Sequence, residues 1–415
     1  MVIIMQKYKL ENGVYLATES IENVNVINLG IFIASGSIYE NNDTRGYSHF
    51  IEHLLFRTKK NGCYLIDNLI QKGVKYGAFT TKEYTCYYFR MIPDEKEFVI
   101  KTISEMFESF ESIEEVDFDT EKNIILSELR NYQDDPRVEN INNLMGISFT
   151  GQSIANEILG DEQNLVNSQL KEIKNFYKSV YTESRAVVSI TGSIDTELVK
   201  TLKQRIEKIK RNETKKIYPI LKFYSNTSIL SKKLKNSIID ISFSFDNKEG
   251  KYTDIELYIF NDILGGMGKS SLLFNIIREK LGLTYTIQSY IERFNDLYII
   301  NIHAETEQAN IEKVLIEISY IFNNIDDFIT KELIDISYKN YVTNLSIGLE
   351  SPMDRMFFYG NNIIFDRHID INSIYEYKKP SRSKILSISK EILLSEPSCS
   401  IIGEDLKDSY SLFFK

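Results

Sequence analysis

Several residue types are scarce in this chain, and their absence excludes common protein classes. Its 415 residues contain no tryptophan and three cysteines, Cys63, Cys86 and Cys399, without any Cys-x-x-Cys pair. An odd number of widely spaced cysteines argues against a disulfide framework and is typical of a reducing compartment. No apolar stretch approaches membrane-spanning length, and the apolar run at residues 2–5 is too short for a signal-peptide core. We therefore expect a cytoplasmic protein without a membrane partner.

Positive charge is also in deficit. Lysine and arginine number 49 against 59 aspartates and glutamates, which gives a formal net charge of −10. This balance argues against a general nucleic-acid-binding surface. A hydrophobic content of 43%, with 26 tyrosines and 24 phenylalanines, is enough to fill a sizeable core. The length allows two domains or one duplicated architecture.

Histidine is rare, yet two of the four histidines stand four residues apart in His49-Phe50-Ile51-Glu52-His53. On a helix, positions i and i+4 share a face, so both imidazoles can reach one ion. Two neutral imidazoles would hold a catalytic zinc, and the Glu52 carboxylate beside them would take the proton from its bound water. The alternative is a pair of helix-surface histidines next to an ordinary carboxylate. A third ligand elsewhere in the chain would favour the metal site.

The segment 120–132 has helical spacing and offers two candidates for that third ligand. Glu121 and Glu128 are seven residues apart, which is about two helical turns, so both lie on one face. Either could equally be an exposed helix carboxylate, because surface glutamates are common.

The order of the expected elements repeats along the chain. In the first half we expect a strand at 26–35, the histidine helix, a hairpin at 76–91, helices at 95–110 and 120–132, and a closing strand at 186–190. In the second half we expect a strand at 238–245, a helix at 254–264, a hairpin at 284–304, helices at 309–322 and 331–347, and a closing strand at 398–402. The hairpins imply antiparallel pairing. This order predicts an α+β protein with two structurally similar halves, each a mixed or antiparallel sheet covered by helices. We expect a zinc-binding catalytic half at 1–210, a linker at 211–230 and a substrate-gripping half at 231–415.

A resemblance to a known family rests on motifs that occur in order along nearly the whole chain. The His-x-x-Glu-His motif, followed some seventy-five residues later by a glutamate in a helix that ends at Asp134-Asp135-Pro136, resembles the inverzincin pattern of the pitrilysin/insulinase family. The nearest in length are half-size members such as mitochondrial processing peptidase and its bacterial relatives. Further similar segments are Leu10–Val14 (an opening strand), Gly36-Ser37 with Glu40, Gly46–Phe56, Ala78–Thr80 (an edge strand), Ile158–Gly160, Ile263–Gly266 and Arg278–Tyr285.

The resemblance implies a role for each matching residue. His49, His53 and Glu128 would bind one zinc ion per chain, and Glu52 would be the general base. Glu121 would orient a metal ligand from outside the coordination sphere. The remaining residues would act on the substrate: Arg278 and Tyr285 by holding its backbone or stabilising the transition state, and Gly77, Ala78 and Phe79 by pairing with it as an added strand. The chain departs from the family at Gly77, where asparagine is frequent, and at Gln152, where histidine is frequent.

The implied function is that of a zinc metalloendopeptidase that hydrolyses short or unfolded peptides inside an enclosed chamber. Removal of targeting or leader peptides is one form that this activity could take. The resemblance also implies a homodimer, or a heterodimer with a related subunit. A different class remains open: a catalytically silent scaffold or partner subunit of a heteromeric peptidase, against which the intact ligand set argues. The other two histidines, His303 and His368, are interpreted as structural.

Overall fold

The computed structural model describes residues 5–182, 185–208, 218–247, 250–266, 268–367, 378–404 and 406, and the chain forms two compact units. Unit 1 comprises Met1–Asn131, Asn156–Pro219 and Ser346–Tyr375. Unit 2 comprises Tyr132–Ala155, Ile220–Leu345 and Glu376–Lys415. Each unit therefore contains a segment from the other half of the sequence. The division at 1–210, 211–230 and 231–415 stays a prediction, and part of that linker, like His368, lies outside the described residues.

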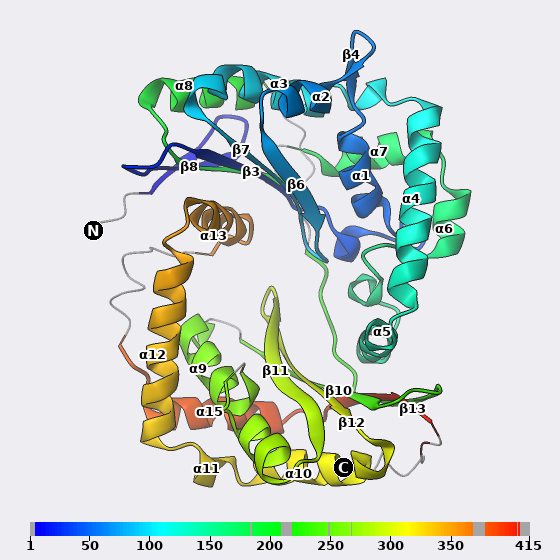
Figure 1. Cartoon of the computed structure of the whole chain (residues 1–415), viewed down its shortest axis with the longest axis vertical. Helices are drawn as coiled ribbons and strands as arrows, with labels where there is room; N and C mark the ends of the chain where they lie inside the picture. Colours follow the sequence, from blue (N-terminus) through cyan, green and yellow to red (C-terminus); the bar gives the residue numbers. More distant parts are fainter. Residues whose placement is uncertain are drawn as a thin grey trace. The chain divides into compact units, whose positions relative to one another are not determined.

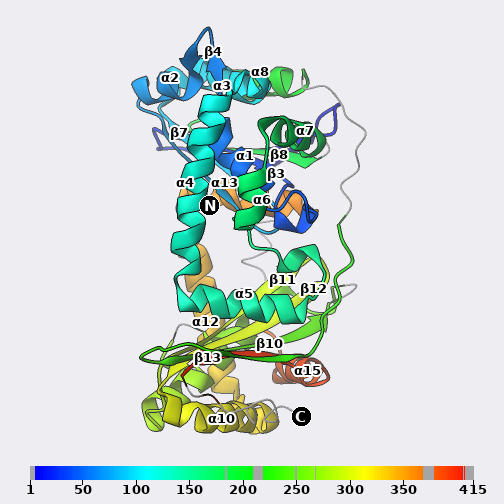
Figure 2. The same cartoon turned by 90° about the vertical axis from the view of Figure 1, so that its right-hand side faces the viewer.

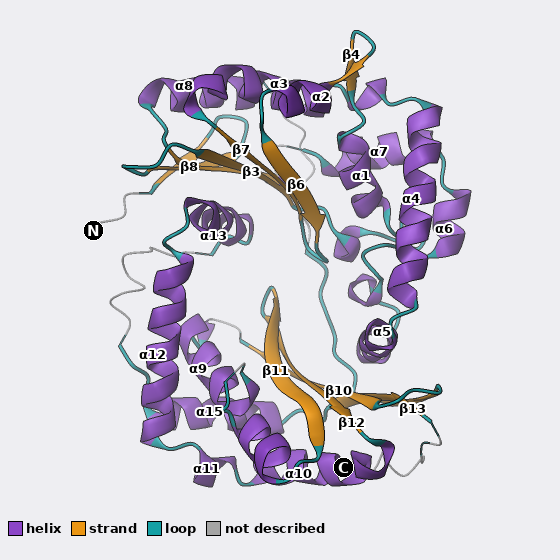
Figure 3. Cartoon of the chain, viewed as in Figure 1, coloured by secondary structure: helices purple, strands orange, loops and turns teal. Residues whose placement is uncertain are grey.

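Unit 1 is built on a six-stranded sheet, as far as the described residues show. Its strand order is β1-β2-β8-β3-β7-β6, and β2 pairs with β8 in parallel while the other pairs are antiparallel. Figures 1 and 3 show β8, β3, β7 and β6 of this sheet. The strands are β1 Gln6–Lys9, β2 Tyr15–Ser20, β3 Ile27–Ile33, β6 Lys75–Thr80, β7 Thr85–Met91 and β8 Ala186–Gly192; β4 Lys59–Lys60 and β5 Cys63–Tyr64 form a separate small hairpin. The strand β6 lies at one edge of the main sheet.

Helices pack on both faces of this sheet. The helices of unit 1 are α1 Tyr47–Leu55, α2 Leu65–Gln71, α3 Lys96–Glu108, α4 Glu115–Gln133, α6 Glu162–Asn167, α7 Leu170–Val180, α8 Thr196–Ile206 and α13 Pro352–Ile364. The first core cluster joins inward-facing strand residues such as Leu29 and Tyr87 to α1, α3, α7 and α8. The opposite face is covered by α13 (Figure 3). The ring centroid of its Phe357 lies 5.4 Å from that of Tyr88. The sheet is thus buried on both sides although its strands are mainly antiparallel.

Unit 2 repeats this arrangement. Its sheet order is β11-β12-β10-β13-β9, with β13 and β9 parallel and the other pairs antiparallel. The elements are α5 Pro136–Ser148, β9 Thr227–Ser231, β10 Ser237–Asp246, α9 Asp254–Gly265, β11 Thr284–Phe294, β12 Leu297–Thr306, α10 Ile311–Asn323, α11 Ile325–Phe328, α12 Lys331–Gly348, α15 Arg382–Leu393 and β13 Ser398–Gly403. The helices α9, α10 and α15 join the core on one face, and α5 packs on β10 and β13 from the other (Figure 2).

The duplication expected from the sequence is confirmed at the level of strand order. Reading each sheet inward from its edge strand gives β6-β7-β3-β8-β2 in unit 1 and β11-β12-β10-β13-β9 in unit 2, with the same sequence of antiparallel and parallel pairs. In each unit, one face of the sheet is covered by a helix from the other half of the sequence. This helix is α13 in unit 1 and α5 in unit 2. The protein is therefore α+β with two similar halves.

One expected strand is wrong. The segment Leu10–Val14 is a tight turn between β1 and β2, closed by a hydrogen bond from the Leu10 N–H to the Val14 carbonyl. Gly13 has a φ of +99°, a conformation that glycine adopts without the steric cost of a side chain. The helix expected at 120–132 is also longer than its pattern indicated, because α4 begins at Glu115.

Candidate metal centre

The helix α1 presents two different stripes. Phe50, Ile51, Leu54 and Leu55 are buried in the core of unit 1, and the Phe50 ring stacks on a ring of α4 at 4.9 Å. Burying such apolar side chains contributes about 1.5–3 kcal/mol each and fixes the rotation of the helix about its axis. The other stripe, with both histidines and the intervening glutamate, is consequently held in one direction.

The start of α1 is fixed by a buried carboxylate. Glu40 accepts hydrogen bonds from the backbone N–H groups of Gly46 (2.8 Å) and Ser48 (2.7 Å). These N–H groups have no partner within the helix, and an anion is favoured at a helix N-terminus. Gly46 has a φ of +84°, and a Cβ at this position would lie 2.7 Å from the Leu159 carbonyl oxygen. Glu40, Gly46 and the turn Ile158–Gly160, all of which lie in segments that resemble the family, thus set where the histidine helix begins.

The structure brings His49, His53 and Glu128 together. One ligand atom from each lies within 4.8 Å of the others. The Nε2 atoms of His49 and His53 lie 3.9 and 3.6 Å from the same carboxylate oxygen of Glu128. Ligand atoms of a tetrahedral zinc, each bound at about 2.0–2.2 Å, are about 3.4 Å apart. The three side chains therefore need only small adjustments to share one ion.

The charge state of His49 and the donor chemistry of all three groups fit zinc. Burial lowers the pKa of His49 to about 3, helped by the neighbouring His53, so its imidazole is neutral and able to bind a cation. His49 Nδ1 is buried and has no hydrogen-bond partner among the described residues. Two imidazole nitrogens with one carboxylate oxygen form a donor set found in catalytic zinc sites, which leave one coordination position open.

Glu121 does not join the cluster but contacts one of its members. Its Oε2 lies 2.9 Å from His53 Nδ1, on the opposite side of the ring from Glu128, and its Oε1 accepts a 2.6 Å hydrogen bond from Arg57 Nε. Burial alone would raise the pKa of Glu121, but His53 and Arg57 together hold that pKa below its usual value. A carboxylate in this position fixes both the tautomer and the ring orientation of a ligating histidine.

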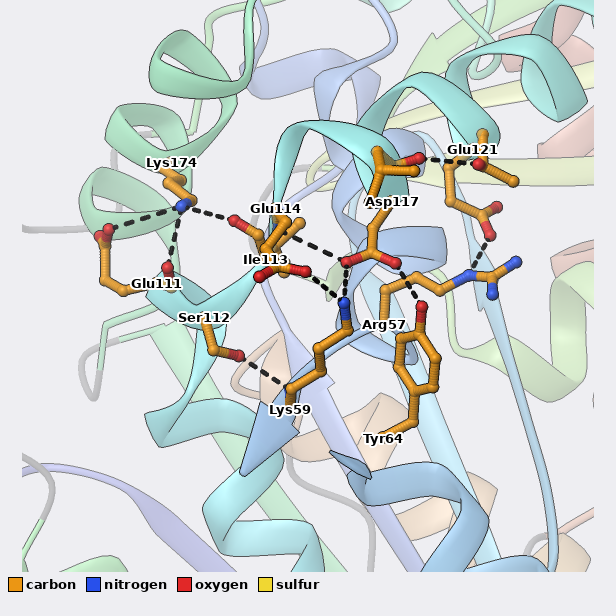
Figure 4. Close-up of polar contacts among 12 residues, drawn as sticks. Arg57, Lys59, Tyr64, Glu111, Ser112, Ile113, Glu114, Asp117, Glu121 and Lys174 are labelled. Atoms are coloured by element: carbon orange, nitrogen blue, oxygen red, sulfur yellow. Dashed lines mark hydrogen bonds and ion pairs between the residues drawn. The ribbon is translucent and has the colours of Figure 1, made fainter. Parts of the chain in front are cut away.

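A chain of polar contacts extends from Glu121 to the small hairpin of β4 and β5 (Figure 4). The Arg57 guanidinium lies over the Tyr64 ring, and the Tyr64 hydroxyl donates to Asp117, 2.5 Å away. Asp117 is also paired with Lys59 at 2.8 Å. These contacts tie the segment after α1 to α4, the helix that supplies both Glu121 and Glu128. The sequence motifs did not indicate Arg57, because its partner is 64 residues away.

Glu52 is held from the neighbouring strand. Its Oε2 accepts a 2.6 Å hydrogen bond from the Thr80 hydroxyl at the end of β6. Burial raises the pKa of Glu52, and the hydrogen bond from Thr80 works against that shift. Sequence analysis placed Thr80 in the edge strand but gave it no role. The alternation of β6 is the signal that could have found it, since Tyr76, Ala78 and Thr80 point to the face on which α1 packs.

A cavity of about 400 Å³ opens beside the cluster, with Glu52 and His53 in its wall. Tyr76 of β6 and Phe56, directly after α1, also line it. Gly77 lies on the opposite side of β6, where an added Cβ would be 2.3 Å from the Tyr88 hydroxyl. The glycine at this family-divergent position thus makes room for the Tyr88 ring, and Ala78 and Phe79 continue the same edge strand.

Arg278 and Tyr285 belong to unit 2, whereas the metal-ligand cluster belongs to unit 1. Arg278 lies in a π-helical segment, Phe274–Lys280, a rare conformation that is frequent at functional sites. Its guanidinium lies 5.8 Å from the ring centroid of Tyr285, which is 74% exposed at the start of the edge strand β11. The structure therefore places these two residues side by side on the surface of their own unit.

Two other residues singled out by sequence are structural. Gln152 exchanges two hydrogen bonds with the backbone of Lys222. His303 is bonded through Nδ1 to Asp240 at 2.8 Å, within a network that includes Asn140 of α5. No cluster of the metal-binding kind other than His49, His53 and Glu128 occurs in the described part of the chain.

Comparison with known proteins gives two family matches in succession. Residues 15–162 match the family described as "Insulinase (Peptidase family M16)", and residues 167–340 match "Peptidase M16 inactive domain". The chain belongs to the insulinase family of peptidases. The segment that matches the insulinase description, residues 15–162, is the one that carries the three metal-type ligands.

Relatives cover either nearly the whole chain or about half of it. "Uncharacterized zinc protease YmxG" of Bacillus subtilis is 24% identical over 96% of this chain and 98% of its own length. "Mitochondrial-processing peptidase subunit beta" of Dictyostelium discoideum is 28% identical, over 50% of this chain and 45% of its own length. The protein is thus a half-size family member with relatives named as zinc proteases.

Two solved structures share the fold. A protease from Helicobacter pylori has a TM-score of 0.87 at 19% identity, covering 97% of this chain and 100% of its own. A peptidase M16 inactive domain from Pseudomonas fluorescens has a TM-score of 0.86 at 15% identity, covering 97% and 98%. Among the described helices, none is long and apolar enough to cross a bilayer.

Proposed function

We propose that this protein is a zinc-dependent endopeptidase. The observation that carries the proposal is the convergence of His49, His53 and Glu128 from two separate helices, with the Glu52 carboxylate beside them. A zinc ion held by these three ligands would activate a water molecule and polarise the scissile carbonyl. The match to the insulinase family and the names of its relatives support the same assignment.

In this proposal each remaining residue has one task. Glu52 accepts the proton of the attacking water and returns it to the leaving amine as the peptide bond breaks. Glu121 keeps His53 oriented from its Nδ1 side. Arg278 and Tyr285 donate to the oxyanion or to a neighbouring carbonyl of the substrate.

We propose that the substrate is a short or unfolded peptide. The strand β6 is an edge strand, and an extended peptide can add to such an edge through backbone hydrogen bonds along Gly77, Ala78 and Phe79. A peptide bound there would pass the cavity that Glu52 and His53 line. We further propose that the enzyme works in the cytoplasm, as a homodimer or with a related subunit, and encloses its substrate in a chamber. Removal of targeting or leader peptides is one such activity, supported by the processing peptidase among the relatives.

The Glu52→Gln variant tests the proposal. The amide cannot accept a proton, so turnover of a peptide library should fall at least 100-fold while zinc content stays at one ion per chain. Peptide products are measured by mass spectrometry with and without a chelator, and zinc by atomic absorption. Glu114→Gln, an exposed carboxylate in the same unit, is the matched control and should retain full activity. Normal cleavage by Glu52→Gln would show that the base is wrongly assigned. Zinc binding without any turnover by the wild-type chain would favour the silent scaffold or partner subunit.

A further inference from the structure

We propose that Thr80 is a positioning residue that holds the general base Glu52 through its hydroxyl group. This inference rests on the proposed function, because it assigns Thr80 a role in the same reaction. The Thr80 hydroxyl donates to Glu52 Oε2 over 2.6 Å, and the two residues come from different elements, β6 and α1. Hydrogen bonds to an ionised carboxylate are about twice as strong as those between neutral groups.

The direction of this hydrogen bond follows from counting protons. Thr85 Oγ1 donates its single proton to the Ser35 carbonyl at 2.9 Å. Thr80 Oγ1 lies 3.2 Å from Thr85 Oγ1, but the Thr85 proton is already used. An ionised carboxylate has no proton to give, so the proton between Thr80 and Glu52 belongs to Thr80. The threonine is therefore the donor in its hydrogen bond with the base.

The sheet fixes the position from which the Thr80 hydroxyl donates to Glu52. Thr80 and Thr85 are register partners in the β6–β7 pair, and Thr85 is fully buried and paired with Ile33 of β3. Both hydroxyl groups face the side of the sheet on which α1 packs, because side chains alternate along a strand. The position of the donor is consequently set by three neighbouring strands rather than by a surface loop.

The consequence for the base is a fixed carboxylate. A glutamate side chain has three rotatable bonds, and Glu52 is only partly buried. With Oε2 bound to Thr80, the carboxylate plane is fixed and Oε1 is left to exchange the proton with water and the leaving amine. Misplacement of a catalytic group by about 1 Å can cost about 100-fold in rate. Since Thr80 also ends the strand that the peptide is proposed to extend, substrate binding and base orientation share one residue.

Two substitutions separate the hydroxyl group from the shape of the side chain. Thr80→Val keeps the branched shape without the donor, and Thr80→Ser keeps the donor. We expect Thr80→Val to lower kcat about 10- to 100-fold, with KM changed less than about twofold and zinc content unchanged. Thr80→Ser should stay within about threefold of the wild-type kcat. The matched control is Thr102→Val in α3, which removes another threonine hydroxyl bond of the same unit, to the Phe98 carbonyl, and should leave kcat unchanged.

A second readout does not depend on activity. Crystal structures of the metal-free wild type and of Thr80→Val should show one orientation of the Glu52 carboxylate in the first and several in the second. The inference is overturned if the Glu52 carboxylate keeps one orientation in Thr80→Val. It is also overturned if Thr80→Val has the wild-type kcat while Glu52→Gln is inactive. Both results leave the proposed function standing. An active Glu52→Gln shows instead that the base is wrongly assigned, and a zinc-bound wild-type chain without turnover favours the silent scaffold or partner subunit. In both cases the crystal structures still decide whether Thr80 holds Glu52. Should Thr80→Val not fold, Thr80→Ala takes its place in both measurements.

Discussion

Glu121 illustrates how a single side chain gains a role from its two neighbours. It is 5% exposed, and its two oxygens are divided between His53 and Arg57. Without the arginine, an ionised carboxylate in this position would be costly to bury. With it, the pair keeps His53 oriented toward Glu128. The carboxylate seven residues further along the same helix is 48% exposed at its side chain and free to bind a cation.

His303 allows a pH-dependent prediction at the same scale. Burial opposes the protonation of His303, but Asp240 and Glu305 more than offset this effect and raise the His303 pKa. Glu305 is itself paired with Arg137 of α5. A raised folded-state pKa gives stability that is fully present below the unfolded value of about 6.5 and is lost as pH rises through the folded value. The free energy of unfolding should therefore decrease with pH above about 6.5 in the wild type, and His303→Gln should lack this component. Urea unfolding at several pH values measures the difference, and equal slopes for the two proteins would contradict the prediction.

At the scale of elements, the helix α13 is attached to its sheet by both shape and charge. Gly360 allows the Phe32 ring to lie against the helix, since a Cβ there would be 2.0 Å from a ring atom. Glu19 of β2 is buried between Arg355, at 2.7 Å, and the Tyr359 hydroxyl, at 2.8 Å. Both carboxylate oxygens are thus satisfied, which a buried charge requires.

Removing the arginine from this pair should be strongly destabilising. Arg355→Ala leaves the buried Glu19 carboxylate without its arginine partner, and we expect a loss of about 3–5 kcal/mol in the free energy of unfolding. Arg130→Ala breaks a solvent-exposed arginine–glutamate pair, with Glu162, and serves as the control, with an expected loss of at most about 1 kcal/mol. Chemical denaturation of both variants gives the comparison. Equal losses would mean that the buried pair does not anchor α13.

Sequence periodicity predicted those elements whose own pattern is strong. The histidine helix, the β6–β7 hairpin and the β11–β12 hairpin were confirmed because apolar spacing and turn residues act locally. The place of α5 and α13 could not be predicted, because each packs on the sheet formed by the other half of the sequence. The contacts of Thr80 and Arg57 were missed for a related reason: hydrogen bonds between elements leave no period in the chain.

At the scale of the whole molecule, the residues proposed to act together are divided between two units. The metal-type ligands and the proposed base are in unit 1, and Arg278 and Tyr285 are in unit 2. Five strands of each sheet follow the same order, but among the described residues only unit 1 contains a metal-binding cluster. The duplication thus produced two similar scaffolds with different chemistry.

Arg278→Ala tests whether unit 2 contributes to catalysis. Loss of one donor to the transition state typically costs 100- to 1000-fold in kcat, so we expect kcat/KM to fall by about that factor. Zinc content and thermal stability should be unchanged, because Arg278 is far in sequence from the ligands and its guanidinium packs only on the rings of Phe274 and Tyr285 in the described structure. Arg293→Ala, at an arginine of β11, is the control and should retain full activity. A fully active Arg278→Ala enzyme would exclude this arginine from the reaction.

The mutual exchange of α5 and α13 has a consequence for how the gene can be divided. A polypeptide that ends between the two halves would lack α13 and leave Phe32, Phe79 and Tyr88 of its sheet uncovered, and the complementary fragment would lack α5. Neither fragment contains all the helices that cover its sheet, so each would aggregate or bind the other fragment. If the gene were split, the two protein fragments would fold only as a complex with each other. In the single chain both halves are covalently linked, so they are always present together.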